Sequence, residues 1–305
     1  KRRGYSDELS TGTIAAGGTL GILIPPSITM IIYGISTGTS IGRLFIAGIF
    51  PGIMLTALFM LWAYIYVRIN SEGKEKVAVT QYTWKERFEI LPKILPFLFL
   101  VIGVLYVLYG GFATPNEASA VGAVFAMILV AFVYKIYKVK DFWNILKESM
   151  EESVMLLLII AASFLFAFVL SNLYITQSLA KELVAMSSNK WLLMLYINIF
   201  LIVAGFFLPP VASILMTAPI LYPIIVAAGF DPIWFGVIVT INMEIGLIHP
   251  PVGLNIFVIQ GIAPEIPLSK ILWGTLPYVI LMMLQIVILC IFPQIATWLP
   301  SFVMG

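Results

Sequence analysis

Charged residues are scarce in this sequence: lysine, arginine, aspartate and glutamate make up 10% of its 305 residues, against about 25% in soluble domains. It has one cysteine and one histidine. A disulfide framework within the chain is therefore excluded. No HExxH or GxSxG spacing points to a hydrolase, so an enzyme is not expected. Apolar residues make up 61%, and the mean hydropathy is +1.05. This composition indicates an integral protein of the lipid bilayer, with no nucleic acid partner.

Apolar windows of about 20 residues predict the membrane-embedded helices. They cover residues 11–36, 44–67, 94–112, 118–134, 154–175, 191–228, 235–259 and 271–292. The connections 68–93 and 135–147 are rich in lysine and arginine, which places both on the cytoplasmic side. Residues 142–152 have the pattern of an interfacial helix leading into the next span.

This topology is consistent only if residues 191–228 enter and leave on the outer face. We therefore expect a re-entrant hairpin whose arms meet at Leu208-Pro209-Pro210. The alternative is two short, complete crossings.

One apolar stretch, IGLIHPPVGLN at residues 245–255, contains the sole histidine and two consecutive prolines. Proline has no backbone N–H and clashes with the preceding turn, so Pro250-Pro251 must break the helix. The carbonyl groups freed by the break need a partner.

A second stretch, LGILIPPSITM at residues 20–30, aligns with the first without a gap. Gly21 pairs with Gly246 and Pro25 with Pro250, at one constant offset. The predicted topology runs the two copies in opposite directions across the membrane. Inverted repeats with broken helices are typical of secondary transporters, whose ion and substrate sites lie at the breaks.

The repeat also predicts a segment that the sequence does not contain. The second copy has its hairpin directly before Gly229, whereas the first copy starts at the matching Gly4. We therefore expect a partner hairpin to precede residue 1, and the chain to be an N-terminally truncated portion.

Sodium can satisfy freed carbonyl groups together with oxygen atoms of nearby side chains. The candidate ion- and substrate-binding residues are Gly18, Thr19, Gly21, Pro25, Pro26, Ser27, Pro209, Ser213, Thr217, Asn242, Glu244, Gly246, His249, Pro250, Gly253 and Asn255. We expect the Na⁺ ligands among Gly18, Thr19, Gly21, Asn242 and Gly246.

Several of these residues also have a structural interpretation. His249 either contacts a substrate carboxylate or is a neutral imidazole bonded to a freed carbonyl. Glu244 either binds the ion or has a buried partner. Asn242 and Asn255 are ion ligands or helix–helix hydrogen-bonding groups, and Glu117 is expected to cap the start of a helix.

Three stretches resemble the large membrane subunit of TRAP transporters, the tripartite ATP-independent periplasmic carriers. They are KRRGYSDELSTGTIAAGGTLGILIPPSI (1–28), GGFATPNEASAVGA (110–123) and GFDPIWFGVIVTINMEIGLIHPPVGLNIFV (229–258). Two positions depart from the family pattern: Pro209-Pro210 replaces an acidic or small polar residue of many hairpin tips, and His249 replaces a common threonine.

The resemblance implies an all-α, inverted-repeat carrier of the elevator type in the bacterial inner membrane. It would import an organic acid, of the C4-dicarboxylate or sialic acid class, with Na⁺ as the coupling ion and no organic cofactor. A periplasmic substrate-binding protein (P-type) and a small membrane subunit (Q-type) would be its partners. The alternatives are a sodium-independent channel, or another inverted-repeat anion carrier without a binding protein.

The resemblance and the repeat together predict the domains. Residues 1–36 form the broken helix of the first repeat, in the transport domain. Residues 37–152 form scaffold helices, a cytoplasmic loop and the interfacial arm helix. Residues 153–261 form the second repeat, with hairpin 191–228 and broken helix 235–259, also in the transport domain. Residues 262–305 form a C-terminal scaffold helix.

Overall fold

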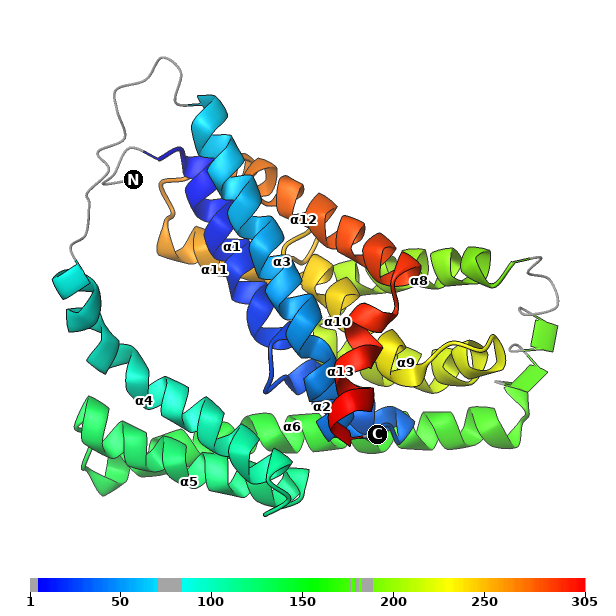
Figure 1. The fold of residues 1–305 in the computed structure, drawn as a ribbon. Coiled ribbons are helices and arrows are strands. Elements are labelled where there is room, and N and C mark those ends of the chain that lie inside the picture. Colours follow the sequence, from blue (N-terminus) through cyan, green and yellow to red (C-terminus); the bar gives the residue numbers. More distant parts are fainter. Residues whose placement is uncertain (1–4, 71–83, 176, 179–180, 183–188, 305) are drawn as a thin grey trace. The chain divides into compact units, whose positions relative to one another are not determined.

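The computed structural model describes residues 5–70, 84–175, 177–178, 181–182 and 189–304 (Figure 1). Within these ranges all regular elements are helices, so the all-α prediction is confirmed. The helices are α1 Asp7–Leu23, α2 Ile28–Thr37, α3 Ile41–Asn70, α4 Trp84–Tyr109, α5 Pro115–Tyr134, α6 Val139–Asn172, α8 Lys190–Phe207, α9 Pro210–Ala227, α10 Pro232–Leu247, α11 Leu254–Ile262, α12 Leu268–Ile291 and α13 Gln294–Met304.

In the part of the chain that the structure describes, seven helical segments are, by length and composition, long and apolar enough to cross a membrane. The chain is thus a multi-pass membrane protein. Its contacts divide it into two compact units, one formed by residues 1–78 with 160–305 and the other by residues 79–159.

In the larger unit, α10 is the central helix. It contacts α8 and α9 as well as α1, α3 and α12, and every residue from Ile233 to Gly246 is buried. A helix that is apolar on all sides is expected in such a position. Figure 1 shows α1, α3 and α12 running side by side, and their contacts agree.

Both predicted helix breaks are present. The first separates α1 from α2 at residues 24–27, where Ser27 caps α2 by accepting a hydrogen bond of 3.2 Å from the Met30 N–H. The second separates α10 from α11 at residues 248–253, and α11 follows Gly253, whose φ of 42° lies in the left-handed region that favours glycine. The proline pairs therefore end both helices where the sequence predicts.

The hairpin candidate consists of α8 and α9, which contact one another and are joined at Leu208-Pro209. The predicted break is therefore in place. Each arm has 18 residues and is, by length and composition, long and apolar enough to cross a membrane. The re-entrant path through the membrane thus stays a prediction.

The structure bears on two of the predicted domain boundaries and assignments. The segment 142–152 is not a separate helix, because α6 runs without interruption from Val139 to Asn172; the boundary at 152/153 therefore falls inside a helix. The helices α3 and α12, predicted as scaffold, pack directly on α1 and α10 in one compact unit. Which helices move and which stay fixed remains a prediction.

In the smaller unit, α4 packs on α5. Helix α5 begins with a capping box: the Thr114 N–H donates to Glu117 Oε2 at 2.8 Å, and the Glu117 N–H donates to Thr114 Oγ1 at 3.4 Å. The expectation that Glu117 caps a helix start is confirmed.

Helices α1 and α12 approach so closely that neither tolerates a side chain at the crossing. A Cβ on Gly12 would overlap the Gly274 carbonyl, and a Cβ on Gly274 would overlap the Glu8 carbonyl. At the start of both helices, Lys270 Nζ lies 3.2 Å from Asp7 Oδ2. The glycine contact sets the spacing of the two helices, since a half-exposed ion pair adds little stability.

Substitution Gly12→Ala should lower the free energy of unfolding by about 1–3 kcal/mol, because the two helix backbones must separate. The measurement is the thermal unfolding midpoint of the purified full-length protein in detergent. The control is Gly42→Ala, whose new methyl group would meet the flexible Met304 side chain at 3.5 Å. Equal losses in the two variants would contradict the close crossing.

Candidate functional site

At the first break, the chain satisfies its own freed carbonyl. Pro26 has no N–H, so the Ile22 carbonyl loses its helical donor. The Thr29 hydroxyl donates to that oxygen at 2.9 Å, and the Ser27 hydroxyl donates to it as well. Both hydroxyl groups are buried. Two side chains therefore serve the Ile22 carbonyl, and sodium ligation at Gly21, whose carbonyl loses its helical donor at Pro25, stays a prediction.

The second break has no such hydroxyl groups. Pro250 and Pro251 free the carbonyls of Gly246 and Leu247, and the positions equivalent to Ser27 and Thr29 are Val252 and Leu254. The Val252 N–H donates at 3.2 Å to the Phe206 carbonyl at the end of α8, which loses its own helical donor at Pro210. The second break is thus tied to the hairpin by a backbone hydrogen bond.

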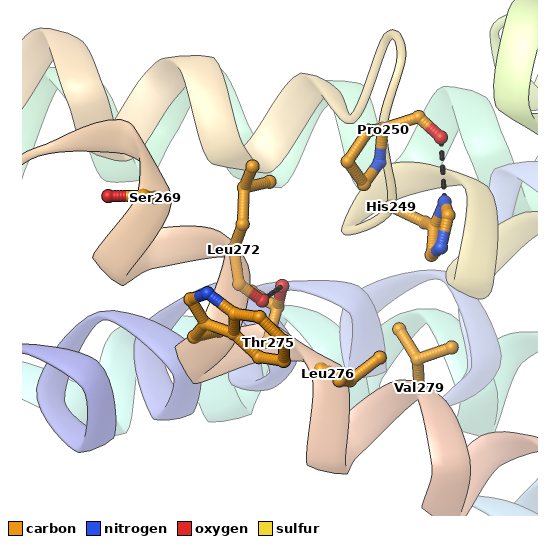
Figure 2. Close-up of a pocket in the computed structure, with 8 residues that line it drawn as sticks. His249, Pro250, Ser269, Leu272, Thr275, Leu276 and Val279 are labelled. Carbon is orange, nitrogen blue, oxygen red and sulfur yellow. Dashed lines mark hydrogen bonds between the residues drawn. The ribbon is translucent and has the colours of Figure 1, made fainter.

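The His249 ring adds two further contacts at this break. Its Nδ1 lies 2.6 Å from the Pro250 carbonyl oxygen, as Figure 2 shows. The ring also stacks on Phe206, with centroids 4.1 Å apart and planes at 15°. His249 therefore bonds to a carbonyl within the break, and both interpretations given above stay predictions.

The first arm of the hairpin lies directly on α10. Gly205 and Gly246 meet backbone to backbone, so that a Cβ on Gly246 would overlap Gly205. Asn242 on α10 also contacts α8: its Nδ2 donates to Oδ1 of Asn198, near the middle of α8, at 2.8 Å. The same Nδ2 donates to the Ile238 carbonyl on α10, also at 2.8 Å. Asn198 was not among the predicted site residues. Its signal in the sequence is an amide within an otherwise apolar helix.

Two buried oxygen atoms near the hairpin have no hydrogen-bond partner: Asn242 Oδ1 on α10 and Ser213 Oγ in the first turn of α9. An unpaired polar atom in an apolar interior costs free energy, so each is suited to an ion. The described residues contain no cluster of three or more His, Cys, Asp or Glu that could hold a metal. Amide, hydroxyl and carbonyl oxygens are left as ligands, and these fit sodium.

Other candidate binding residues lie on α1, α9 and α11. On α1, Gly18 and Gly21 are exposed, whereas Thr19 is buried and donates to the Ala16 carbonyl at 2.8 Å. Asn255 Nδ2 donates to the Ala15 carbonyl at 3.1 Å, so Asn255 links the second repeat to α1. Thr217 donates to the Ser213 carbonyl at 2.7 Å.

Glu244 is fully buried, and its carboxyl oxygens have no partner. At 100° per residue, it points about 160° away from both Asn242 and Gly246. The structure therefore directs Glu244 away from the hairpin that packs on those two residues.

A cavity of about 290 Å³ lies between the second break and α12 (Figure 2). Its lining residues are His249, Pro250, Ser269, Leu272, Trp273, Thr275, Leu276 and Val279. The pocket borders the break on the side of α12.

Removing both hydroxyl groups of the first break should cost more than the sum of the single losses. In Ser27→Ala or Thr29→Val one donor to Ile22 remains, whereas the double variant leaves a buried carbonyl unpaired, at about 1–3 kcal/mol. Thermal unfolding of all three variants measures the difference. The control is Thr240→Val, because the Thr240 hydroxyl bonds to the Gly236 carbonyl, which already has a helical donor. If the double variant loses only the sum of the stability losses of the two single variants, the two hydroxyl groups do not share the Ile22 carbonyl in this way.

A family profile and individual relatives give the same assignment for this chain. A sequence profile described as "Tripartite ATP-independent periplasmic transporter, DctM component" matches residues 1–295. The C4-dicarboxylate TRAP transporter large permease protein DctM of Pseudomonas aeruginosa is 39% identical, over 98% of this chain and 69% of that protein.

Two further relatives carry other substrates in their names. The ectoine TRAP transporter large permease protein TeaC of Halomonas elongata is 34% identical, over 98% of this chain and 69% of that protein. The sialic acid TRAP transporter large permease protein SiaM of Vibrio cholerae is 30% identical, over 99% of this chain and 69% of that protein. The names of these relatives all describe large permease proteins of TRAP transporters. The chain belongs to the DctM family, the large permease components of TRAP transporters, and is a multi-pass protein of the inner membrane.

Proposed function

We propose that this chain is the transporting part of a sodium-coupled importer of an organic acid. A periplasmic substrate-binding protein delivers the acid, and a small membrane subunit completes the membrane complex. The single observation that carries the proposal is the packing of the hairpin on α10 at the second break, where each of the two elements holds a buried oxygen without a partner, Ser213 Oγ and Asn242 Oδ1. The family match and the names of the relatives support the substrate class.

Sodium would bind where α10, its break and the hairpin meet. The side-chain oxygens Asn242 Oδ1 and Ser213 Oγ have no hydrogen-bond partner. Carbonyls of the break that lose their helical donors to the prolines, such as that of Leu247, would complete the coordination. An ion held in this way bridges two helical elements. Binding would therefore favour the arrangement in which the hairpin rests on the break.

Contacts that tie the hairpin, α10 and α1 together support an elevator mechanism. The hairpin is tied to α10 by the Gly205–Gly246 contact and the Asn198–Asn242 hydrogen bond. The second repeat is tied to α1 through Asn255. A unit linked in this way can carry an ion and a substrate together without separating its own helices.

The transport test uses proteoliposomes that contain the full-length large permease and its small membrane subunit. Uptake of a radiolabelled C4-dicarboxylate and of radiolabelled sialic acid is measured with and without an inward sodium gradient and the cognate binding protein. We expect accumulation that requires both. Downhill flux indifferent to sodium and to the binding protein would instead establish a channel.

The proposed ion site predicts how the sodium dependence of uptake changes when a ligand is removed. Removing one oxygen ligand, in Asn242→Ala or Ser213→Ala, should raise the half-saturating sodium concentration about threefold to tenfold. Sodium titration of initial uptake rates gives this value. The control is Thr240→Val, on the same buried helix, which should leave it unchanged. If both alanine variants keep the wild-type sodium dependence, these oxygens do not bind the ion.

A further inference from the structure

Glu244 carries a buried carboxyl group near the end of α10, shortly before the second break. Its exposed fraction is 0%, and in the part of the chain that the structure describes it is the one carboxyl group whose two oxygens are both buried without a hydrogen-bond partner. Buried polar groups are almost always hydrogen-bonded, and an unpaired one costs free energy that an apolar side chain would avoid. An unpaired ionisable group inside a membrane protein therefore points to a function.

The helices around α10 offer this carboxyl group no counter-charge. Helix α10 contacts α1, α2, α3, α8, α9, α11, α12 and α13. On these helices, as far as the structure describes them, charged side chains occur only among the first three or last three residues: Asp7, Glu8, Arg43, Arg68, Lys190 and Lys270. None of them forms an ion pair with Glu244, and Lys270 is paired with Asp7 and Glu8. An ionised Glu244 would thus be an isolated charge in an apolar interior, which is strongly unfavourable.

The neutral titratable groups of these helices do not contact Glu244 either. The Tyr33 hydroxyl donates to the Pro232 carbonyl at 2.9 Å, and the Tyr278 hydroxyl lies 2.6 Å from Thr13 Oγ1. None of the remaining groups is a hydrogen-bond partner of the carboxyl oxygens; these groups are Tyr64, Tyr66, Tyr196, Tyr222, Cys290, the Asp231 cap of α10 and His249 in the break. A positively charged ligand is therefore needed to neutralise the carboxylate.

A proton fits this position better than a metal ion does. A metal ion needs a shell of several oxygen ligands. Apart from Asn242 and Ser213, which we assign to sodium, the buried side-chain oxygens without a partner in the described chain are Glu244 Oε1 and Oε2, Gln260 Oε1 and Gln285 Oε1. The described residues also contain no cluster of three or more His, Cys, Asp or Glu that could hold a metal. A proton needs only one carboxyl oxygen, and it makes the group neutral.

We propose that Glu244 is a proton-binding site, through which the carrier couples proton movement to the transport of its acid. The carboxylate takes a proton from water on the outer side and releases it to water on the cytoplasmic side, so the group is unchanged after each cycle. Because no hydrogen bond holds the proton in place, it can leave as soon as water reaches the group.

This site is separate from the proposed sodium site, since Glu244 and Asn242 point in directions about 160° apart around α10. The coupling to transport rests on the proposed function and adds a second coupling ion to it. The presence of the proton on Glu244 does not depend on that function, so the two are tested separately.

The first experiment detects the proton. Infrared difference spectra compare the wild type with Glu244→Gln, each as the full-length permease with its small subunit at pH 7, in a detergent without carbonyl groups. The wild type should show a band of a protonated carboxyl group that the variant lacks. The matched control is Glu117→Gln, which removes an exposed carboxyl group and should remove carboxylate bands instead. If Glu244→Gln also removes only carboxylate bands, the proposal is wrong.

The second experiment measures the coupling in proteoliposomes that contain the full-length permease, its small subunit and the binding protein. Sodium is equal on both sides, the membrane potential is clamped, and the substrate is radiolabelled succinate or sialic acid, whichever accumulates in the sodium test. An inward gradient of one pH unit should raise the accumulation of the acid up to about tenfold, because one coupled proton contributes a factor of ten. In Glu244→Gln the response to the pH gradient should fall to about one.

Exchange of labelled for unlabelled acid shows whether the variant is still a carrier. The amide in Glu244→Gln imitates the protonated acid, so exchange should continue, and Glu244→Asp, which keeps a carboxyl group, should keep part of the response to the pH gradient. An equal response in the wild type and Glu244→Gln would overturn the proposal, as would a loss of exchange in a variant with the wild-type unfolding temperature. Flux indifferent to sodium would refute the sodium coupling alone and leave the infrared result unchanged.

Discussion

The structure depends on one constraint: a backbone carbonyl freed inside an apolar protein must find a partner, at a cost of several kcal/mol if it does not. Two proline pairs create this demand within helices that are otherwise continuous and apolar. Side chains meet it at the first break, where the hydroxyls of Ser27 and Thr29 donate to the Ile22 carbonyl. At the second break the Val252 N–H donates to a carbonyl of the neighbouring hairpin, that of Phe206, which loses its helical donor at Pro210.

This difference gives the two halves of an internal repeat different properties. The first break is closed by groups within a few residues of the prolines, so its geometry follows from local sequence. The second break is supported by Phe206, by Gly205 against Gly246 and by the stacked His249 ring. All of these contacts involve the end of α8. A displacement of the hairpin would therefore alter the second break and leave the hydrogen bonds of the first unchanged.

The breaks, the hairpin arms and the all-α fold could be predicted from the sequence, because proline and long apolar windows act locally. Side-chain directions could not. Phe206 is one aromatic residue among many, and its stacking on His249 depends on how the hairpin packs. Residues 142–152 were predicted as a helix leading into the next span, and they form the first part of the continuous helix α6, whereas their interfacial position stays a prediction.

The hairpin contact also supports the proposal that the ion site lies at the second break. Asn242 Oδ1 and Ser213 Oγ are buried without hydrogen-bond partners, Asn242 on the helix that the hairpin covers and Ser213 within the hairpin itself. In the proposed function an ion that binds oxygens of both elements would favour their contact, because a ligand stabilises the arrangement to which it binds more tightly. Ion binding and hairpin closure would then be coupled equilibria.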